Sequence, residues 1–222
     1  MPLAQTAQGS ACTKEGSYDM KRKRLTWLGA GAVLAATAAL LVPMIAGSAA
    51  GGAANHQYRW DLIDVDFAAG SVAAGGIASA RANDNSKITL TGSGTFHANS
   101  GKSQDVSGGG TWQTFSPGGA PTASGTYEVT GFVDFELAPG TPPLPVDLIG
   151  NLADVRAGLA VLRIAYSDGS DGTLVISCHL VGTPDTVFEG ITATKGFVDY
   201  WNPEAPPAPP GNENRTIFHV LT

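Results

Sequence analysis

A Gly-Thr-aromatic tripeptide occurs three times in this chain of 222 residues, as GTF at 94–96, GTW at 110–112 and GTY at 125–127. In each copy the glycine and the ring are two residues apart, so they lie on the same face of an extended strand. Apolar and polar residues alternate around the copies, most regularly over 87–98 and 126–137, which is typical of half-buried β-strands. Glycines on the apolar face let long strands coil strongly, so we expect the sheet to curve until it closes, with the three rings inside.

The same alternation recurs from residue 58 to the C-terminus, interrupted by turn-forming residues. NDNS at 83–86 and SDGSDG at 167–172 predict tight hairpins. A turn is preferred to a calcium-binding loop for SDGSDG, because this stretch has too few spaced oxygen ligands. Proline-rich segments at 138–158 and 203–211 predict long connections, the first with a helical turn at its end. The expected fold class is all-β, an antiparallel up-and-down barrel of about eight strands after an N-terminal signal or anchor helix, with a two-sheet sandwich as the alternative. The predicted strands are Tyr58–Phe67, Ile77–Ala82, Lys87–Ala98, Gly110–Phe115, Thr126–Leu137, Leu159–Ser167, Thr173–Val181, Phe188–Trp201 and Thr216–Leu221.

The N-terminal part has the order of an export signal. Residues 1–24 form a basic cytoplasmic segment, 25–47 are uncharged and apolar, 48–56 are a small-residue linker, and 57–222 are the barrel domain. The apolar run is longer than the ~7–15 residues of a cleaved signal and approaches the ~20 that span a bilayer, so an uncleaved membrane anchor is the alternative. We expect the barrel domain to be secreted, or anchored to the outer face of the cytoplasmic membrane by residues 25–47.

Charge and cysteine content limit the partners of the exported part. Residues 51–222 hold 8 Lys and Arg against 17 Asp and Glu, a net charge of −9, so we expect no nucleic acid partner. Membrane contact is expected only through the N-terminal segment, if it is not cleaved. Cys178 is the one cysteine after the leader and cannot form an internal disulfide. The histidines lack metal-ligand spacing, and we expect no metal and no cofactor.

No motif identifies a catalytic residue, and the candidate ligand site rests on Arg163. This residue shares a strand face with apolar neighbours, so it lies either inside the barrel with a carboxylate partner or outside under a covering element. Glu189 is the candidate partner, and a paired interior arginine is a plausible ligand anchor. Tyr127, Tyr166 and Trp112 are the candidate pocket lining.

The stretches SKITLTGSGTF, SGTYEVTGFVDFEL, GLAVLRIAYSDGS, GTLVISCHL and VFEGITATKGFVDYWN carry a resemblance that covers about residues 57–222. Their arrangement resembles uncharacterised secreted bacterial proteins with barrels like those of the allene oxide cyclase and dirigent families. That resemblance implies a cup-shaped barrel that takes a small apolar or phenolic ligand and guides its cyclisation or coupling without a cofactor. No catalytic residue of those families maps onto this chain.

Three functions remain open from the sequence. The first is an exported, non-enzymatic barrel that binds a small apolar ligand or an envelope component. The second is a cofactor-free isomerase or cyclase, and the third is a purely structural envelope protein. A wide dry cavity would favour the first, a cavity with two or more buried polar groups around an apolar wall would favour the second, and side chains packed to the centre would favour the third.

Overall fold

The computed structural model describes residues 56–98 and 105–221. The predicted leader and linker, residues 1–24, 25–47 and 48–56, lie outside the described residues except for His56. Within the described ranges, no helix is both long enough and apolar enough to cross a membrane.

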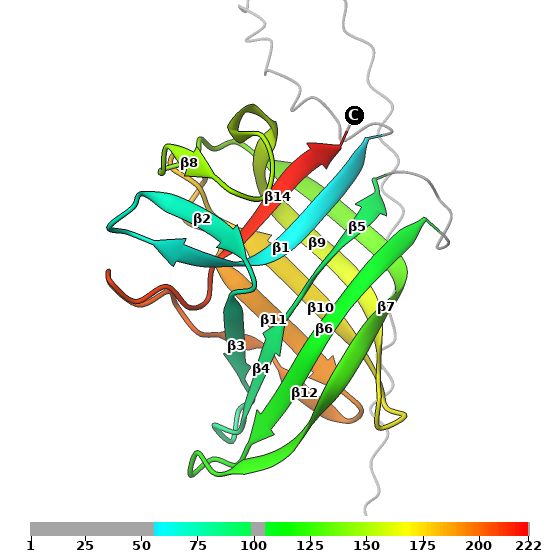
Figure 1. The fold of residues 1–222 in the computed structure, drawn as a ribbon. Helices are drawn as coiled ribbons and strands as arrows, with labels where there is room; N and C mark the ends of the chain where they lie inside the picture. The colour runs from blue at the N-terminus through cyan, green and yellow to red at the C-terminus, as the bar shows by residue number, and fades with distance from the viewer. Residues whose placement is uncertain (1–55, 99–104, 222) are drawn as a thin grey trace, which may run out of the picture. The chain divides into compact units, whose positions relative to one another are not determined.

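Six antiparallel strands form a closed ring (Figure 1). Each strand hydrogen-bonds to the next, and the last returns to the first, so the ring has no free edge. The prediction of a closed antiparallel barrel is confirmed; the expected count of about eight strands is wrong, because the ring has six. In spatial order the ring strands are β1 (Gln57–Asp66), β5 (Ser93–His97), β6 (Val106–Phe115), β7 (Pro121–Ala138), β9 (Val155–Tyr166) and β14 (Thr216–Leu221).

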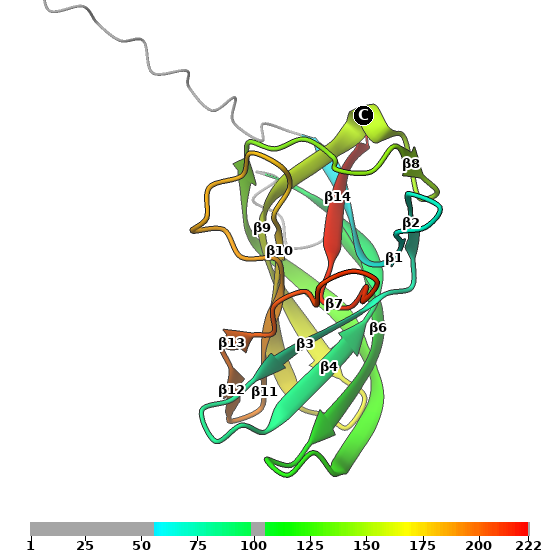
Figure 2. The same cartoon turned by 90° about the vertical axis from the view of Figure 1, so that its left-hand side faces the viewer.

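The sheet continues beyond the ring because two of the ring strands change partners along their length. Strand β6 pairs with β5 through residues 106–109 and then with β4 through residues 112–115. Strand β9 likewise pairs with β14 at Val155 and Arg156, and with β10 from residue 158 onward. These added strands lie in the lower half of the molecule in Figures 1 and 2, together with the hairpin of β6 and β7. They are β3 (Ile77–Arg81) and β4 (Lys87–Thr91) on one flank, and β10 (Asp171–Cys178), β11 (Gly190–Lys195) and β12 (Val198–Tyr200) on the other.

The outer edge of β3 is covered by the proline-rich segment that precedes β14. Strand β13 (Asn202–Pro203) pairs with the end of β3, and the backbone N–H of Glu204 donates to the carbonyl oxygen of Ser79 at 3.1 Å. The side-chain oxygen of Asn214 accepts from the backbone N–H of Ser79 at 2.7 Å. These bonds satisfy backbone groups that an open sheet edge would expose.

The rings of the three Gly-Thr-aromatic repeats point into the core, as predicted. Phe96, Trp112 and Tyr127 are 0%, 3% and 2% exposed. In the β6–β7 register, Trp112 lies opposite Gly125 and Tyr127 lies opposite Gly110. Each of these two rings therefore lies across from a glycine of the neighbouring strand. A Cβ added at Gly125 would lie 3.0 Å from Nε1 of Trp112, and one added at Gly110 would lie 2.0 Å from the carbonyl oxygen of Thr91.

Side chains fill the interior of the barrel. Four rings pack within 4.6–6.2 Å of one another between ring centroids in the upper half. The lower half is filled by aliphatic side chains and a second aromatic group. The upper rings are Tyr58, Phe96, Phe135 and Phe218, and the lower ones include Trp112, Tyr127 and Tyr166.

All nine predicted strands are present, and two of them are interrupted. The predicted strand at 87–98 breaks at Gly92, whose φ of +146° favours glycine, and the strand at 188–201 breaks at the turn between β11 and β12. The hairpins at 83–86 and 167–172 are confirmed. Two sites that need positive φ, Asn85 and Gly169, lie in these hairpins.

The predicted loop at 138–158 contains a segment that we call the strap, residues 139–152. Within the strap, β8 (Val146–Asp147) pairs in parallel with β2 (Ser71–Ala74), a strand that folds back on the end of β1. A short 3-10 helix (Leu152–Asp154) begins at the end of the strap, where a helical turn was predicted. Neither two-stranded pairing was predicted, because β2 and β8 are too short to show alternation.

Candidate ligand-binding pocket

The three aromatic residues predicted to line a cavity lie instead in the packed lower core. Trp112 Nε1 donates to the carbonyl oxygen of Thr126 at 3.0 Å, and the Tyr127 hydroxyl donates to that of Thr91 at 2.9 Å. The Tyr166 hydroxyl donates to the carbonyl oxygen of Thr194 at 2.8 Å. Burial raises the pKa of both tyrosines, which keeps these hydroxyls protonated donors.

Lys195 closes the lower end of this core. Its Nζ lies 4.2 Å from the ring centroid of Trp112 and 4.8 Å from that of Tyr166. The same ammonium group pairs with Asp168 and donates to the hydroxyl of Ser170 at 2.8 Å. The interaction with Lys195, ahead of the bonds from Ser170, lowers the pKa of Asp168 to about 2.

Arg163 lies on the outer face of β9 and is exposed, so it is neither inside the barrel nor covered. No ion pair joins Arg163 to Glu189, which corrects the predicted pairing; Arg163 stands opposite Thr173 on β10 and Gly131 on β7. It borders only an open surface hollow. Alternation placed Arg163 on the correct strand face, but the apolar neighbours on that face are only partly buried in the structure.

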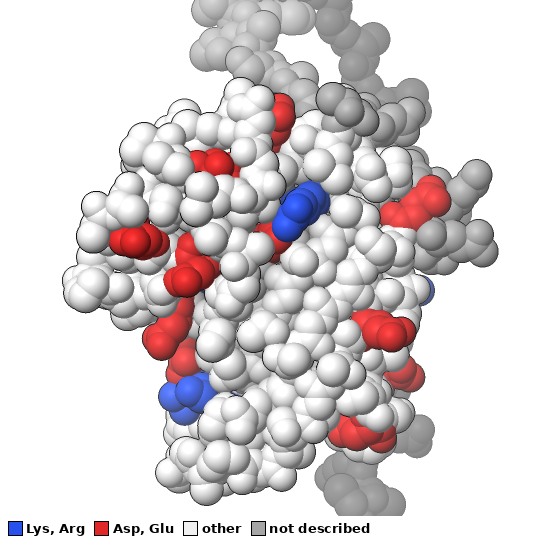
Figure 3. Space-filling model, viewed as in Figure 1, with Lys and Arg blue, Asp and Glu red and all other residues white. Residues whose placement is uncertain are grey.

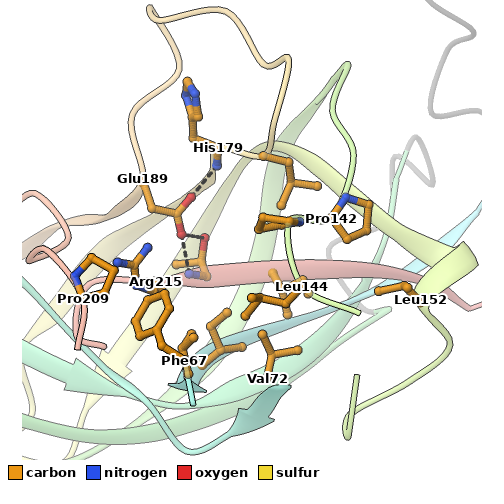
Figure 4. Close-up of a pocket in the computed structure, with 15 residues that line it drawn as sticks. Phe67, Val72, Pro142, Leu144, Leu152, His179, Glu189, Pro209 and Arg215 are labelled. Atoms are coloured by element: carbon orange, nitrogen blue, oxygen red, sulfur yellow. Dashed lines mark hydrogen bonds between the residues drawn. The ribbon is translucent and has the colours of Figure 1, made fainter. Parts of the chain in front are cut away.

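The structure does contain an apolar pocket, of about 360 Å³, on the outside of the ring beneath the strap (Figure 4). Ile63 and Ile217 form its floor; they alternate with the inward-facing Leu62 and Phe218 and so project from the outer faces of β1 and β14. The strap and the loops before β11 and β14 supply the walls. The apolar lining is Ile63, Val65, Phe67, Val72, Pro142, Pro143, Leu144, Leu152, Leu180, Pro209 and Ile217.

Glu189 is the acidic side chain in the lining of this pocket. One carboxyl oxygen accepts from the backbone N–H of His179, and the other accepts from the backbone N–H of Thr216 at 2.6 Å. Burial among apolar groups raises the pKa of Glu189 to about 8, although these hydrogen bonds and the charge of Arg215 act in the opposite direction. At neutral pH the carboxyl is therefore mostly protonated.

Arg215 is the cationic side chain in the lining. Its guanidinium lies over the ring of Phe67, 5.0 Å from the ring centroid, and Nη2 donates to the carbonyl oxygen of Pro207 at 3.0 Å. Its Nε is buried and has no hydrogen-bond partner among the described residues. Figure 4 shows this guanidinium between Phe67 and Glu189 at the edge of the pocket. Arg215 could not be recognised in the sequence, because a lone arginine before a strand resembles any solvated charge.

A buried hydrogen bond between two side chains holds the strap against the outer face of β14. The Nε2 of His219 lies 2.6 Å from Oδ2 of Asp147, and both side chains are almost fully buried. Asp147 also accepts backbone N–H bonds from Ile149 at 2.8 Å and Gly150 at 3.1 Å. Burial raises the pKa of Asp147, but the bonds from His219, Ile149 and Gly150 outweigh burial and lower it overall.

Acidic side chains are spread over the face of the molecule seen in Figure 3, where basic side chains are few. In the described part of the chain, no group of three or more His, Cys, Asp or Glu residues lies close enough to hold a metal ion. Cys178 is fully buried on the inner side of β10, where burial raises the pKa of its thiol.

Comparisons of the chain with protein-family models, with curated proteins and with solved structures give no match.

Proposed function

We propose that this protein is an exported, non-enzymatic barrel that binds a small apolar ligand. The observation that carries the proposal is the pocket beneath the strap: about 360 Å³, walled by apolar side chains, with two convergent polar groups at one edge. Ligand sites of soluble proteins have this composition and volumes of roughly 300–1,000 Å³. The filled centre of the barrel by itself favours a purely structural role for the ring. The pocket outside the ring is what supports ligand binding, with the ring as its scaffold. Export rests on the predicted leader.

Two leucines near the end of the strap provide a matched test. Leu152 lines the pocket at its edge and is 36% exposed, whereas Leu148 is 68% exposed and is not part of the lining. A Leu152→Trp substitution would fill the pocket without disturbing the ring, and Leu148→Trp would add the same ring outside it. The probe is N-phenyl-1-naphthylamine, an uncharged molecule whose fluorescence rises in apolar surroundings.

We expect the wild-type protein and Leu148→Trp to bind the probe with equal affinity, and Leu152→Trp to bind at least tenfold more weakly. Thermal unfolding of the three proteins checks that each is folded. Absence of probe binding to the wild type, or unchanged binding by Leu152→Trp, would contradict the proposal.

A second candidate function is a cofactor-free isomerase or cyclase, which the resemblance to the allene oxide cyclase and dirigent families implies. The specific observation in its favour is the Glu189 carboxyl, whose pKa of about 8 keeps a proton available near neutral pH inside an apolar pocket. Cyclisation of an allylic epoxide to one enantiomer, lost in Glu189→Gln, would support it. A racemic product equal to that formed without protein would reject it.

A further inference from the structure

The inference concerns the polar edge of the pocket and rests on the proposed function. Among the lining side chains, only Glu189, Arg215 and the imidazole of His179 carry ionisable groups; the others are apolar except for the hydroxyl of Thr216. The His179 ring is engaged elsewhere, with Nδ1 at 2.6 Å from the carbonyl oxygen of Val187. The choice of ligand head group therefore depends on Glu189 and Arg215.

Arg215 is positioned to receive an acceptor that the protein does not supply. The ring of Phe67 and the carbonyl of Pro207 hold the guanidinium in place, while its buried Nε meets no acceptor. Nε itself is sealed off, so a ligand in the pocket would meet the guanidinium through its other N–H groups. A guanidinium also presents parallel N–H groups that match the two oxygens of a carboxylate.

Glu189 does not neutralise Arg215. The two side chains form no ion pair, and both carboxyl oxygens of Glu189 already accept backbone N–H groups. Because the Glu189 carboxyl is mostly protonated at neutral pH, the positive charge of Arg215 has no balancing charge in the lining. An anionic head group would supply that balance in surroundings where charge interactions are weakly screened.

We propose that the ligand is a small apolar acid, whose carboxylate binds Arg215 and whose hydrocarbon part lies on the apolar lining between the strap and the outer faces of β1 and β14.

The test compares two molecules with the same chain and different heads, octanoate and 1-octanol, as competitors of N-phenyl-1-naphthylamine at pH 7. A charge-assisted hydrogen bond contributes about 1.5–3 kcal/mol. We therefore expect octanoate to displace the probe at a concentration at least about tenfold lower than 1-octanol requires. In Arg215→Met this preference should disappear, with the affinity for 1-octanol unchanged within about twofold. Arg163→Met, which removes an exposed arginine from the outer face of β9, should keep the preference.

Arg215 also donates to the carbonyl oxygen of Pro207, so Arg215→Met could disturb the local structure. Arg215→Lys is a second variant, which retains the positive charge and loses the planar guanidinium. It should keep a reduced preference for octanoate. Equal displacement by octanoate and 1-octanol in the wild type, or a full preference in Arg215→Met, overturns the inference while probe binding leaves the proposed function standing. Failure of the wild type to bind the probe overturns both.

Discussion

At neutral pH the Glu189 carboxyl holds a proton that an exposed glutamate would have released. Its surroundings are the apolar lining of the pocket, and two backbone N–H groups with one nearby guanidinium do not compensate for the lost hydration. The pKa rises from 4.5 to about 8. A group with a raised pKa in the folded state binds its proton more tightly there than in the unfolded chain.

The contribution of Glu189 to the free energy of unfolding is fully present below pH 4.5, falls as the pH rises towards 8, and is lost above 8. In Glu189→Gln this fall should be absent, so the difference in unfolding free energy between wild type and variant should change by on the order of 4 kcal/mol between pH 5 and pH 9. Urea denaturation at pH 5, 7 and 9 measures it. Glu128→Gln, at an exposed position on β7, is the control and should show no such change; an identical pH profile for wild type and Glu189→Gln would contradict the prediction.

The sequence singled out Glu189 and assigned it the wrong partner. Alternation identifies the face on which a side chain lies, but the atoms that meet Glu189 come from His179, ten residues earlier, and Thr216, twenty-seven residues later. Both are backbone groups, which every residue carries, so no residue type marks them in the sequence. Arg215 was missed because its position depends on the ring of Phe67 and the carbonyl oxygen of Pro207, and only the fold brings these groups to it.

The strap is the element on which the pocket depends, and its attachment is concentrated at Asp147. This carboxylate pairs with His219 and accepts the backbone N–H groups of Ile149 and Gly150. Gly150 itself must be small, because an added Cβ would lie 2.8 Å from the His219 ring. Away from this point, the strap is held by the short β2–β8 pairing, by a bridge between Thr141 and Val181, and by the Thr183 hydroxyl, which donates to the carbonyl oxygen of Pro139 at 2.7 Å.

Asp147→Ala should therefore release the strap while leaving the ring intact. We expect amide hydrogen exchange at Leu148, Ile149 and Gly150 to accelerate at least tenfold, because a partnerless buried histidine and two lost hydrogen bonds weaken local closure. Exchange in β9 should stay within twofold of wild type, and probe affinity should fall. Asp199→Ala, at an exposed position on β12, serves as the control. Unchanged exchange across the strap in Asp147→Ala would show that other contacts hold it.

Among the structural elements, the long strands were predictable from the sequence and the position of the strap was not. Each long strand carries its own alternation, so its existence can be read locally. The strap is proline-rich and irregular, and the sequence predicts a loop without saying which surface it covers. Its position depends on His219 and on Val72, residues that lie 72 positions after and 75 positions before Asp147.

Across the whole molecule, one continuous core joins the ring to the lower half, and the sheet turns sharply where glycines of β5 and β6 meet. An added Cβ at Gly94 would lie 2.1 Å from the carbonyl oxygen of Ser107 and 2.7 Å from the Cα of Gly108. It would also lie 2.9 Å from Nε1 of Trp60, which faces Gly94 across the β1–β5 pair. Backbone atoms cannot move aside as a flexible side chain can, so even a methyl group would force the strands apart.

Gly94→Ala should lower the free energy of unfolding by on the order of 3 kcal/mol. Because the core is continuous, we expect one cooperative transition, with far-ultraviolet circular dichroism and tryptophan fluorescence giving the same midpoint. Gly118→Ala is the matched control: its added Cβ would have only the Ser116 hydroxyl within 4 Å, at 3.9 Å. Its stability should stay within about 1 kcal/mol of wild type. A loss below 1 kcal/mol in Gly94→Ala, or two separate transitions, would contradict this account.

The closed, curved sheet was predictable because the glycine and ring positions recur within single strands. The number of strands in the ring was not, since β6 and β9 each exchange one partner for another along their length. Alternation identifies a strand but not the strand that pairs with it. The number of predicted strands therefore does not give the number of strands in the ring.

The solid interior has a consequence for how such a protein could change over evolutionary time. The pocket is bordered mainly by the strap and by connections between strands, whereas most of the buried apolar core lies on the strands themselves. Substitutions or insertions in those connections can change which ligands bind without changing the core residues of the strands. New ligand specificities can therefore arise through single changes in these connections, because the stability of the strands does not depend on them.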